Sequence, residues 1–233
     1  MPTALRTGPS VAGIDRYRGG WVIAMRDQGA ITLVAEPDTT GALARTTGCE
    51  VVTVDMPMAL PVSGQRVAEQ ELRTALGRAA RSVFTSPTRA AIDAATQNEA
   101  TSINRANDGP GISAQAWGLA GSIRELRATL SGHSHLRRWC ETHPETAFAL
   151  LNGGPPLASK RSAQGVGQRL ALLRPLVPSV DDLLCSAPAK VPVDDVLDAL
   201  AALWSASRVV SGTHQTFGPE GSDDQGFEQS IRV

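Results

Sequence analysis

The chain has few of the residues that define several protein classes. Aromatic side chains make up only 4% of its 233 residues, so Ala, Val, Leu and Ile must build the core. The three cysteines, Cys49, Cys140 and Cys185, are odd in number and far apart. This pattern implies no disulfide framework and has no zinc-binding spacing. We expect free, buried thiols in a reducing cytosol.

Long apolar runs and an excess of charge of one sign are also missing. No stretch reaches the ~18–20 consecutive apolar residues that a membrane span needs, and residues 1–10 lack the apolar segment of a signal peptide. We therefore expect a cytoplasmic protein with no membrane partner. The formal net charge is −1, so nucleic acid would have to bind through a local basic patch.

The residues that are present predict an α/β fold. Hydrophobic residues make up 42% of the chain and charged residues 19%, as in a globular protein. Glycine-containing turns at residues 16–20 and 27–29 separate three apolar runs, which favours an antiparallel meander. The expected strands are Val11–Asp15, Trp21–Met25, Ile31–Ala35, Val51–Asp55 and Leu136–Glu141.

Helical periodicity, caps and turn residues predict the remaining elements. The expected helices are Thr39–Thr47, Gln65–Arg81, Pro87–Thr101, a long helix capped by Ser113 that ends near Leu130, a helix from Thr142 through Leu151, Ala163–Leu173, Val180–Leu184 and Val193–Val210. Residues 152–156 form a loop, and Gly212 is the expected C-cap of the last helix. We interpret residues 1–233 as one domain, with a helical insertion at about 62–132 and an acidic flexible tail at about 218–233.

Two apolar runs end on an aspartate, Asp15 after the first and Asp55 after the fourth. A buried strand that stops at a carboxylate delivers a charged group to the edge of a sheet. Two such groups side by side repel each other unless a positive charge lies between them. Oxygen ligands of this kind suit Mg²⁺ or Mn²⁺.

Three further acids are candidates for the same site. Asp195 and Asp198 are three residues apart on the last helix, so they lie on one face. Asp198 lies beyond the first turn of the helix, so its charge gains little from the helix dipole, and a short acid has poor helix propensity there. Glu141 ends the fifth strand. Glu145 is explained by a capping box with Thr142, so we assign it no chemistry.

Acids from two strand ends and a late helix match the ligand set of two-metal phosphodiester chemistry. No nucleophile elbow, zinc-protease helix motif or phosphate-binding loop is present. The candidate catalytic residues are Asp15, Asp55, Asp195, Asp198 and Glu141, of which the four aspartates are also the expected metal ligands. Basic residues that could hold the phosphates of a substrate are Arg81, Arg89 and Lys160.

A series of short motifs occurs along the chain in a fixed order. They are Gly13–Asp15 with Gly19–Val22, Asp55–Pro61, Arg81–Phe84 with Pro87 and Arg89, Gly111–Trp117, Glu141–Glu145 with Phe148, Ser159–Lys160 with Gly165 and Arg169, and Asp194–Ala199. In this series the chain resembles a family of predicted RNase H-like nucleases, domain of unknown function family 429, over roughly residues 11–212.

The resemblance implies an RNase H-like mixed sheet of three antiparallel strands plus two parallel strands, flanked by helices. It also implies that the last helix brings Asp195 and Asp198 back to Asp15 and Asp55, similar to Holliday-junction resolvases. One segment departs from the family pattern: 66–69 reads Arg-Val-Ala-Glu where the family often has Arg-x-Cys-Asp.

We expect a metal-dependent nuclease or phosphodiesterase that uses Mg²⁺ or Mn²⁺ and acts on nucleic acid. We also expect a homodimer, because dimers are the commonest oligomers of proteins. Two alternatives stay open. Asp15 followed by a Gly-rich turn also occurs in phosphotransferases and nucleotide hydrolases of the sugar-kinase and actin superfamily. The near-neutral charge and scarce aromatics also fit a non-catalytic binding or scaffold module that retains the fold.

Overall fold

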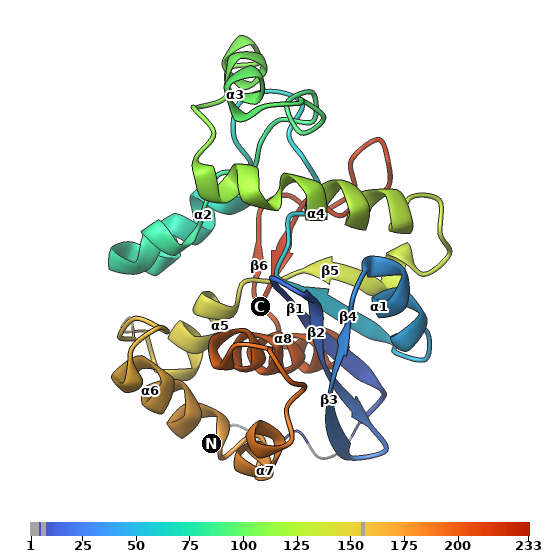
Figure 1. Cartoon of the computed structure of the whole chain (residues 1–233), viewed down its shortest axis with the longest axis vertical. Helices are drawn as coiled ribbons and strands as arrows, with labels where there is room; N and C mark the ends of the chain where they lie inside the picture. The colour runs from blue at the N-terminus through green and yellow to red at the C-terminus, as the bar shows by residue number, and fades with distance from the viewer. Residues whose placement is uncertain (1–4, 6–7, 155–156) are drawn as a thin grey trace. The chain divides into compact units, whose positions relative to one another are not determined.

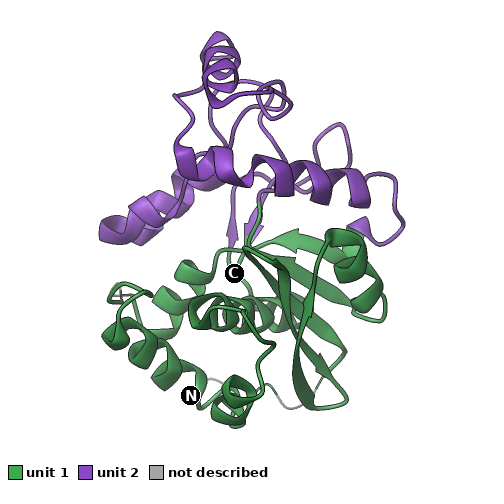
Figure 2. Cartoon of the chain, in the orientation of Figure 1, with its two compact units in different colours: residues 1–56, 137–215, 232–233 green, residues 57–136, 216–231 purple. Residues whose placement is uncertain are grey.

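The computed structural model describes residues 5, 8–154 and 157–233. The end of the loop expected at 152–156, residues 155–156, lies outside this range. The chain divides into two compact units (Figure 2). Unit 1 comprises residues 1–56, 137–215 and 232–233, and unit 2 comprises residues 57–136 and 216–231. The segment expected as a helical insertion, about 62–132, falls within unit 2.

A mixed sheet runs through the fold (Figure 1). Strands β1, β2 and β3 form an antiparallel meander, β4 runs parallel to β1, and β5 runs parallel to β4, which confirms the predicted arrangement of these five strands. The order is β3-β2-β1-β4-β5-β7-β6, so two short strands that the sequence did not predict extend the sheet. The strand bounds are β1 Val11–Tyr17, β2 Gly20–Asp27, β3 Ala30–Glu36, β4 Val51–Val54, β5 Trp139–Glu141, β6 Thr216–Phe217 and β7 Ile231–Arg232.

Helix α8 (Val193–Ser211) packs against β1, β2 and β4, and its apolar side chains from Val196 to Leu203 are buried. Gly13 on β1 makes this packing possible, because a Cβ at this position would overlap the backbone of Leu203 and Ala202. On the adjacent strand, the Thr53 hydroxyl donates to the Ala202 carbonyl at 2.7 Å. Gly212 closes α8 in the left-handed conformation, as predicted.

The other helices of unit 1 are α1 Thr39–Arg45, η2 Leu136–Arg138 at its edge, α5 Pro144–Leu151, α6 Ala163–Leu173 and α7 Val180–Cys185. Helix α1 packs on β2 and β3, whereas α5 and α6 pack on α8. The predicted cap of α5 was wrong. His143, not Thr142, is the N-cap, and its ring nitrogen accepts from the Thr146 amide. Thr142 instead extends the pairing of β5, because its amide donates to the Val54 carbonyl at 3.0 Å.

Unit 2 contains α2 Val67–Leu76, η1 Gly77–Ser82, α3 Gln97–Ala106 and α4 Ala114–Leu130. Ser113 caps α4, as predicted. The helix predicted at 87–101 begins only at Gln97, after the cap Thr96. Residues before it are held in turns, and the Thr88 amide donates to the Asn104 side chain instead of to a helical carbonyl.

The segment expected as an acidic flexible tail carries β7, and the Phe227 and Ser230 side chains in it are buried. Arg127 stacks over the Phe227 ring at 4.2 Å within unit 2. All three cysteines are free; Cys49 and Cys140 are buried as expected, but Cys185 is exposed. Among the described residues, none of the helices combines the length and the apolar character needed to cross a membrane.

Candidate active site

Asp15 and Asp55 lie next to each other on neighbouring strands. The sequence predicted that the first strand ends at Asp15, but β1 continues to Tyr17, whereas Asp55 directly follows β4. Ile14 pairs with Val54 in the parallel β1–β4 ladder, and the Asp55 amide donates to the Ile14 carbonyl at 3.1 Å. The two aspartates are therefore at equivalent positions of neighbouring strands. Side chains alternate along a strand, so Asp15 points to the same face as Gly13, the face that α8 covers.

Glu141 is at a different position. It pairs with Val54 in the β4–β5 ladder, one residue before Asp55. Because the alternation has a period of two, Glu141 projects from the opposite face of the sheet to Asp55. Its charge nevertheless raises the pKa of Asp55, second to burial, whereas Lys160 lowers that pKa. The register thus points Glu141 to the other face of the sheet, but its charge still acts on Asp55.

Helix α8 brings Asp198 and Asp195 to the same face. Asp198 is 1% exposed, and its charge raises the pKa of Asp15. Asp195 lies one turn earlier, is half-buried, and also raises the pKa of Asp15. The close contact of α8 with Gly13 explains why this helix can carry its acids so near the sheet. We call Asp15, Asp55, Asp195 and Asp198 the aspartate cluster.

Burial is the main reason that these acids are hard to ionise. It raises the pKa of Asp15 well above its usual value, with further contributions from Asp198 and Asp55. It raises the pKa of Asp55 and of Asp198 to about 7, although Lys160 lowers both. Burial and then Asp194 raise the pKa of Asp195 to about 6. Groups perturbed in this way concentrate at functional sites.

Lys160 is the cation at the centre of this cluster. Its Nζ donates to Asp198 Oδ2 in an ion pair. Burial on its own lowers the pKa of Lys160, but the charges of Asp198, Asp15 and Asp55 outweigh it and raise that pKa above its ordinary value. The other carboxylate oxygen, Asp198 Oδ1, is buried and has no hydrogen-bond partner. One lysine charge is thus shared among four carboxylates.

Glu145 and Arg169 belong to the surroundings of the site, and the sequence argument gave them no role of their own. Arg169 is 1% exposed and binds both oxygens of Glu145, at 2.6 and 2.7 Å. The Nη2 atom makes these two bonds, and Nη1 donates to the carbonyls of Ala158 and Gly165. The signal that could have located this pair is the Arg itself: it lies on the buried side of a helix, where an unpaired charge is costly.

The donor chemistry of the cluster fits a hard divalent cation, because carboxylate oxygens are the ligands that Mg²⁺ and Mn²⁺ prefer. The unpartnered Asp198 Oδ1 is a free acceptor of that kind. In the described part of the chain, however, no three His, Cys, Asp or Glu side chains are arranged to hold a metal ion as they stand. The residues are therefore of the right chemical type to bind a divalent cation, but Asp198 is already paired with Lys160.

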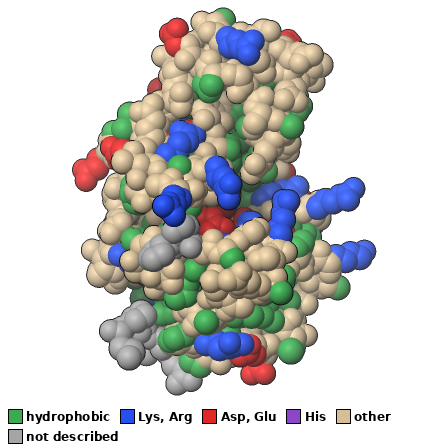
Figure 3. Space-filling model, turned by 90° about the vertical axis from the view of Figure 1, so that its left-hand side faces the viewer, with side chains coloured by type: hydrophobic (Ala, Val, Ile, Leu, Met, Phe, Trp, Pro, Cys, Tyr) green, Lys and Arg blue, Asp and Glu red, His purple; other side chains and the backbone are tan. Residues whose placement is uncertain are grey.

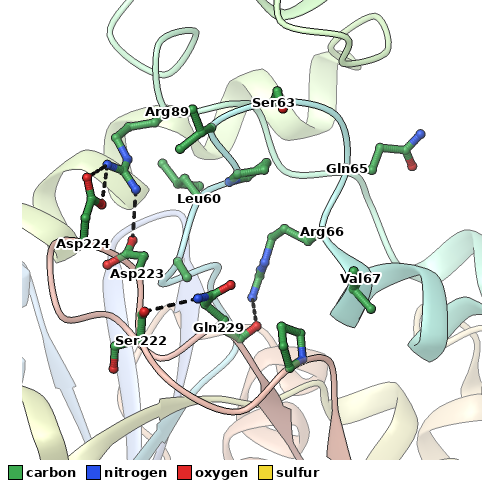
Figure 4. Close-up of a pocket in the computed structure, with 14 residues that line it drawn as sticks. Leu60, Ser63, Gln65, Arg66, Val67, Arg89, Ser222, Asp223, Asp224 and Gln229 are labelled. Carbon is green, nitrogen blue, oxygen red and sulfur yellow. Dashed lines mark hydrogen bonds and ion pairs between the residues drawn. The ribbon is translucent and has the colours of Figure 1, made fainter.

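The other two predicted substrate-binding residues, Arg81 and Arg89, lie in unit 2. Arg81 is exposed at the end of η1. Arg89 lines a pocket with a volume of about 530 Å³ (Figure 4). There it pairs with Asp223 at 3.4 Å and with Asp224 at 2.6 Å. Its charge is therefore met by two acids of its own unit.

Figure 3 shows one face of the molecule, on which Lys and Arg side chains occur at several places and acidic side chains lie among them. This mixed pattern agrees with the net charge of −1.

Residues 13–222 match the model of the family described as Protein of unknown function (DUF429). The match spans most of the chain, which therefore belongs to this family. Searches of the curated proteins and of the solved structures returned no match.

Proposed function

We propose that this protein is a metal-dependent phosphodiesterase with an RNase H-like fold, and that it acts as a nuclease. The observation that carries the proposal is the aspartate cluster: two neighbouring strands and one helix bring four carboxylates to one face of the sheet. Their raised pKa values reflect an excess of negative charge in a buried place. A bound Mg²⁺ or Mn²⁺ would neutralise that excess and supply Lewis-acid activation of a phosphodiester.

The proposal assigns roles to the chain's own residues. Asp15, Asp55 and Asp198 hold the cation, since these are the acids of the cluster whose pKa values are raised most by their surroundings. Asp195 is less buried and is the outermost ligand. Glu141 remains a predicted fifth acid, although the pairing of β4 with β5 points its side chain to the other face of the sheet. Arg81 and Arg89 remain predictions as phosphate contacts.

The test combines metal binding with nuclease assays. Mn²⁺ binding to the wild-type protein is measured by calorimetry, and cleavage is assayed on single-stranded, duplex and branched substrates. We expect Mn²⁺ to bind and one substrate class to be cut. D15N should lose both, because it removes a ligand without changing the size of the side chain.

The matched control is D181N. Asp181 is an exposed aspartate that pairs with Arg174 on the surface, so its amide variant should bind Mn²⁺ and cut like the wild type. Absence of Mn²⁺ binding in the wild type, or nuclease activity that survives in D15N, contradicts the proposal.

The Lys160–Asp198 ion pair favours a second candidate, a non-catalytic module that retains the fold. In this case Lys160 is a permanent structural partner of the cluster, and the fold binds its target without cutting it. Nucleic-acid binding in a gel-shift assay that is unaffected by Mn²⁺ and by D15N, with no cleavage of any substrate, would support this candidate over the nuclease.

A further inference from the structure

The chain uses lysine very rarely. Of its 22 basic residues only two are lysines, Lys160 and Lys190, and the other twenty are arginines. Lys190 is exposed in a turn, whereas Lys160 is the residue that reaches the aspartate cluster. The two side chains are not interchangeable here. An ammonium is a compact point charge on a flexible stem, whereas a guanidinium is a planar fork that can bind several fixed partners at once, as Arg169 binds Glu145 and two carbonyls.

The ammonium of Lys160 acts on several acids at once. It is bonded to Asp198, and it lowers the pKa of Asp55 and Asp15 as well. Its effect on Asp195 has the same sign. The ion pair places the ammonium against the Asp198 carboxylate, where a metal ion held by this group would also lie.

The backbone that carries Lys160 is firmly anchored on both sides. The Ala158 amide donates to Gln168, and its carbonyl accepts from Arg169 at 2.9 Å. The Ser159 carbonyl accepts from the amide and the hydroxyl of Ser162.

Helix α6 lies so close to this segment that a Cβ at Gly165 would overlap the Ser159 carbonyl. The main chain at Lys160 is thus fixed, and only the side chain is left to move. That side chain is 33% exposed, compared with 1% for its partner Asp198, so it has a path to solvent.

We propose that the Lys160 ammonium is a built-in counter-charge that occupies the cation position of the aspartate cluster, and that a divalent metal ion binds there by displacing it. The inference rests on the proposed metal-dependent function. It accounts for two observations together: Lys160 holds one oxygen of the buried Asp198 carboxylate, and the other oxygen has no partner. Rotation of one side chain would release the second oxygen.

The first experiment follows the chemical reactivity of the two lysines. Full-length wild-type protein is acetylated briefly with and without Mn²⁺, and the extent of modification at each lysine is read by peptide mass spectrometry. We expect Lys160 to react slowly without metal and several-fold faster with Mn²⁺. Lys190 is the internal control, and its rate should not change.

The second experiment measures Mn²⁺ affinity by calorimetry in the wild type, K160M and the matched control K190M. Removal of the competing charge should tighten Mn²⁺ binding by about tenfold or more, the size of effect that groups around metal ligands commonly have. K190M should bind like the wild type. If K160M does not fold, the acetylation experiment on the wild-type protein still decides the matter.

The outcomes separate the two proposals. If Mn²⁺ binds the wild type but neither the Lys160 reactivity nor the K160M affinity changes, displacement is wrong and the metal-dependent function stands. Weaker Mn²⁺ binding in K160M also overturns displacement, because it makes Lys160 a supporting residue. If Mn²⁺ binds neither the wild type nor K160M, the proposed function fails and the displacement fails with it.

Discussion

The two units of the chain both hold buried charge, but they balance it in different ways. In unit 2, the acids meet arginines in ion pairs: Glu69 lies between Arg66 and Arg73, and Asp223 pairs with Arg89 and Arg127. In unit 1, four aspartates share Lys160.

The balanced charges of unit 2 need no ligand to explain them. The unbalanced charges of unit 1 leave raised pKa values at Asp15, Asp55, Asp195 and Asp198. The pocket of about 530 Å³ lies in unit 2, yet the perturbed acids lie in unit 1. We place the chemistry with the acids, because a shifted pKa with a named cause says more about reactivity than an open volume does.

The largest effect should follow from removing an acid of unit 1. D198N removes a buried carboxylate at the centre of the cluster and leaves Lys160 without its partner. We expect metal-dependent cleavage to fall by at least about 100-fold, the upper end of what even outer partners of metal ligands cost. Initial rates under saturating Mn²⁺ measure it, with circular dichroism to verify folding. Cleavage rates of D198N within threefold of the wild type would show that the excess of buried acids in unit 1 is not needed for cleavage.

Next in size is the loss of Arg169, a buried cation of unit 1 that is paired with Glu145. R169M leaves Glu145 without its partner and the Ala158 carbonyl without its side-chain donor. Breaking a buried ion pair costs about 3–5 kcal/mol, so we expect a decrease in the free energy of unfolding near 3 kcal/mol in urea titrations.

The control for this variant is R174M, which breaks the surface pair with Asp181, whose two side chains are 53% and 60% exposed. Such pairs contribute about 0–1 kcal/mol. Equal losses in R169M and R174M would mean that the Arg169 pair does not anchor the segment that carries Lys160.

The unbalanced charge of unit 1 should also make stability depend on pH. Aspartates in the unfolded chain titrate near their ordinary pKa of about 3.9, whereas Asp55 and Asp198 titrate at about 7 in the folded protein. Between these values the folded protein binds more protons than the unfolded chain, so the free energy of unfolding falls as pH rises. We expect a loss on the order of 2–5 kcal/mol between pH 5 and pH 7.5 without metal.

Urea titrations at several pH values measure this slope. D198N should flatten the slope, and D181N should keep it, because the pKa of Asp181 is lowered by its surface hydrogen bond to Arg174. A wild-type protein that grows more stable from pH 5 to pH 7.5 would show that the cluster is not an excess of buried negative charge.

The smallest effect is expected in unit 2. R89M removes a cation whose charge is met by Asp223 and Asp224, and the pair is partly exposed. We expect a loss of about 1 kcal/mol in stability, as for other exposed pairs, and no change in Mn²⁺ affinity. A large loss of Mn²⁺ binding in R89M would show that the balanced charges of unit 2 take part in the cation site.

The strands could be read from the sequence because their signals are local, although β1 continues to Tyr17 instead of ending at Asp15. Val11–Asp15 and Val51–Asp55 are apolar runs that end on a charge, and the structure places Asp15 and Asp55 side by side. The helix of Asp198 has a clear periodicity and a glycine cap. Such patterns depend on neighbouring residues, so one sequence is enough to find them.

What could not be read depends on distant partners. Lys160 and Asp198 are 38 residues apart, and nothing near Lys160 in the sequence tells a phosphate contact from an internal ion pair. Glu145 looked like a capping residue, but Arg169 on another helix binds it, and His143 takes the cap. The acidic residues from 218 onward looked unstructured, although burial of Phe227 depends on contacts made across unit 2.

The central claim is that the aspartates of unit 1 surround a cation position. The most direct measurement is anomalous diffraction from a crystal of the wild-type protein soaked in Mn²⁺. We predict one strong peak within coordinating distance of Asp15, Asp55 and Asp198, with the Lys160 side chain turned away from Asp198. A Mn²⁺-saturated crystal with no peak at these carboxylates, and Lys160 still bonded to Asp198, would contradict the account.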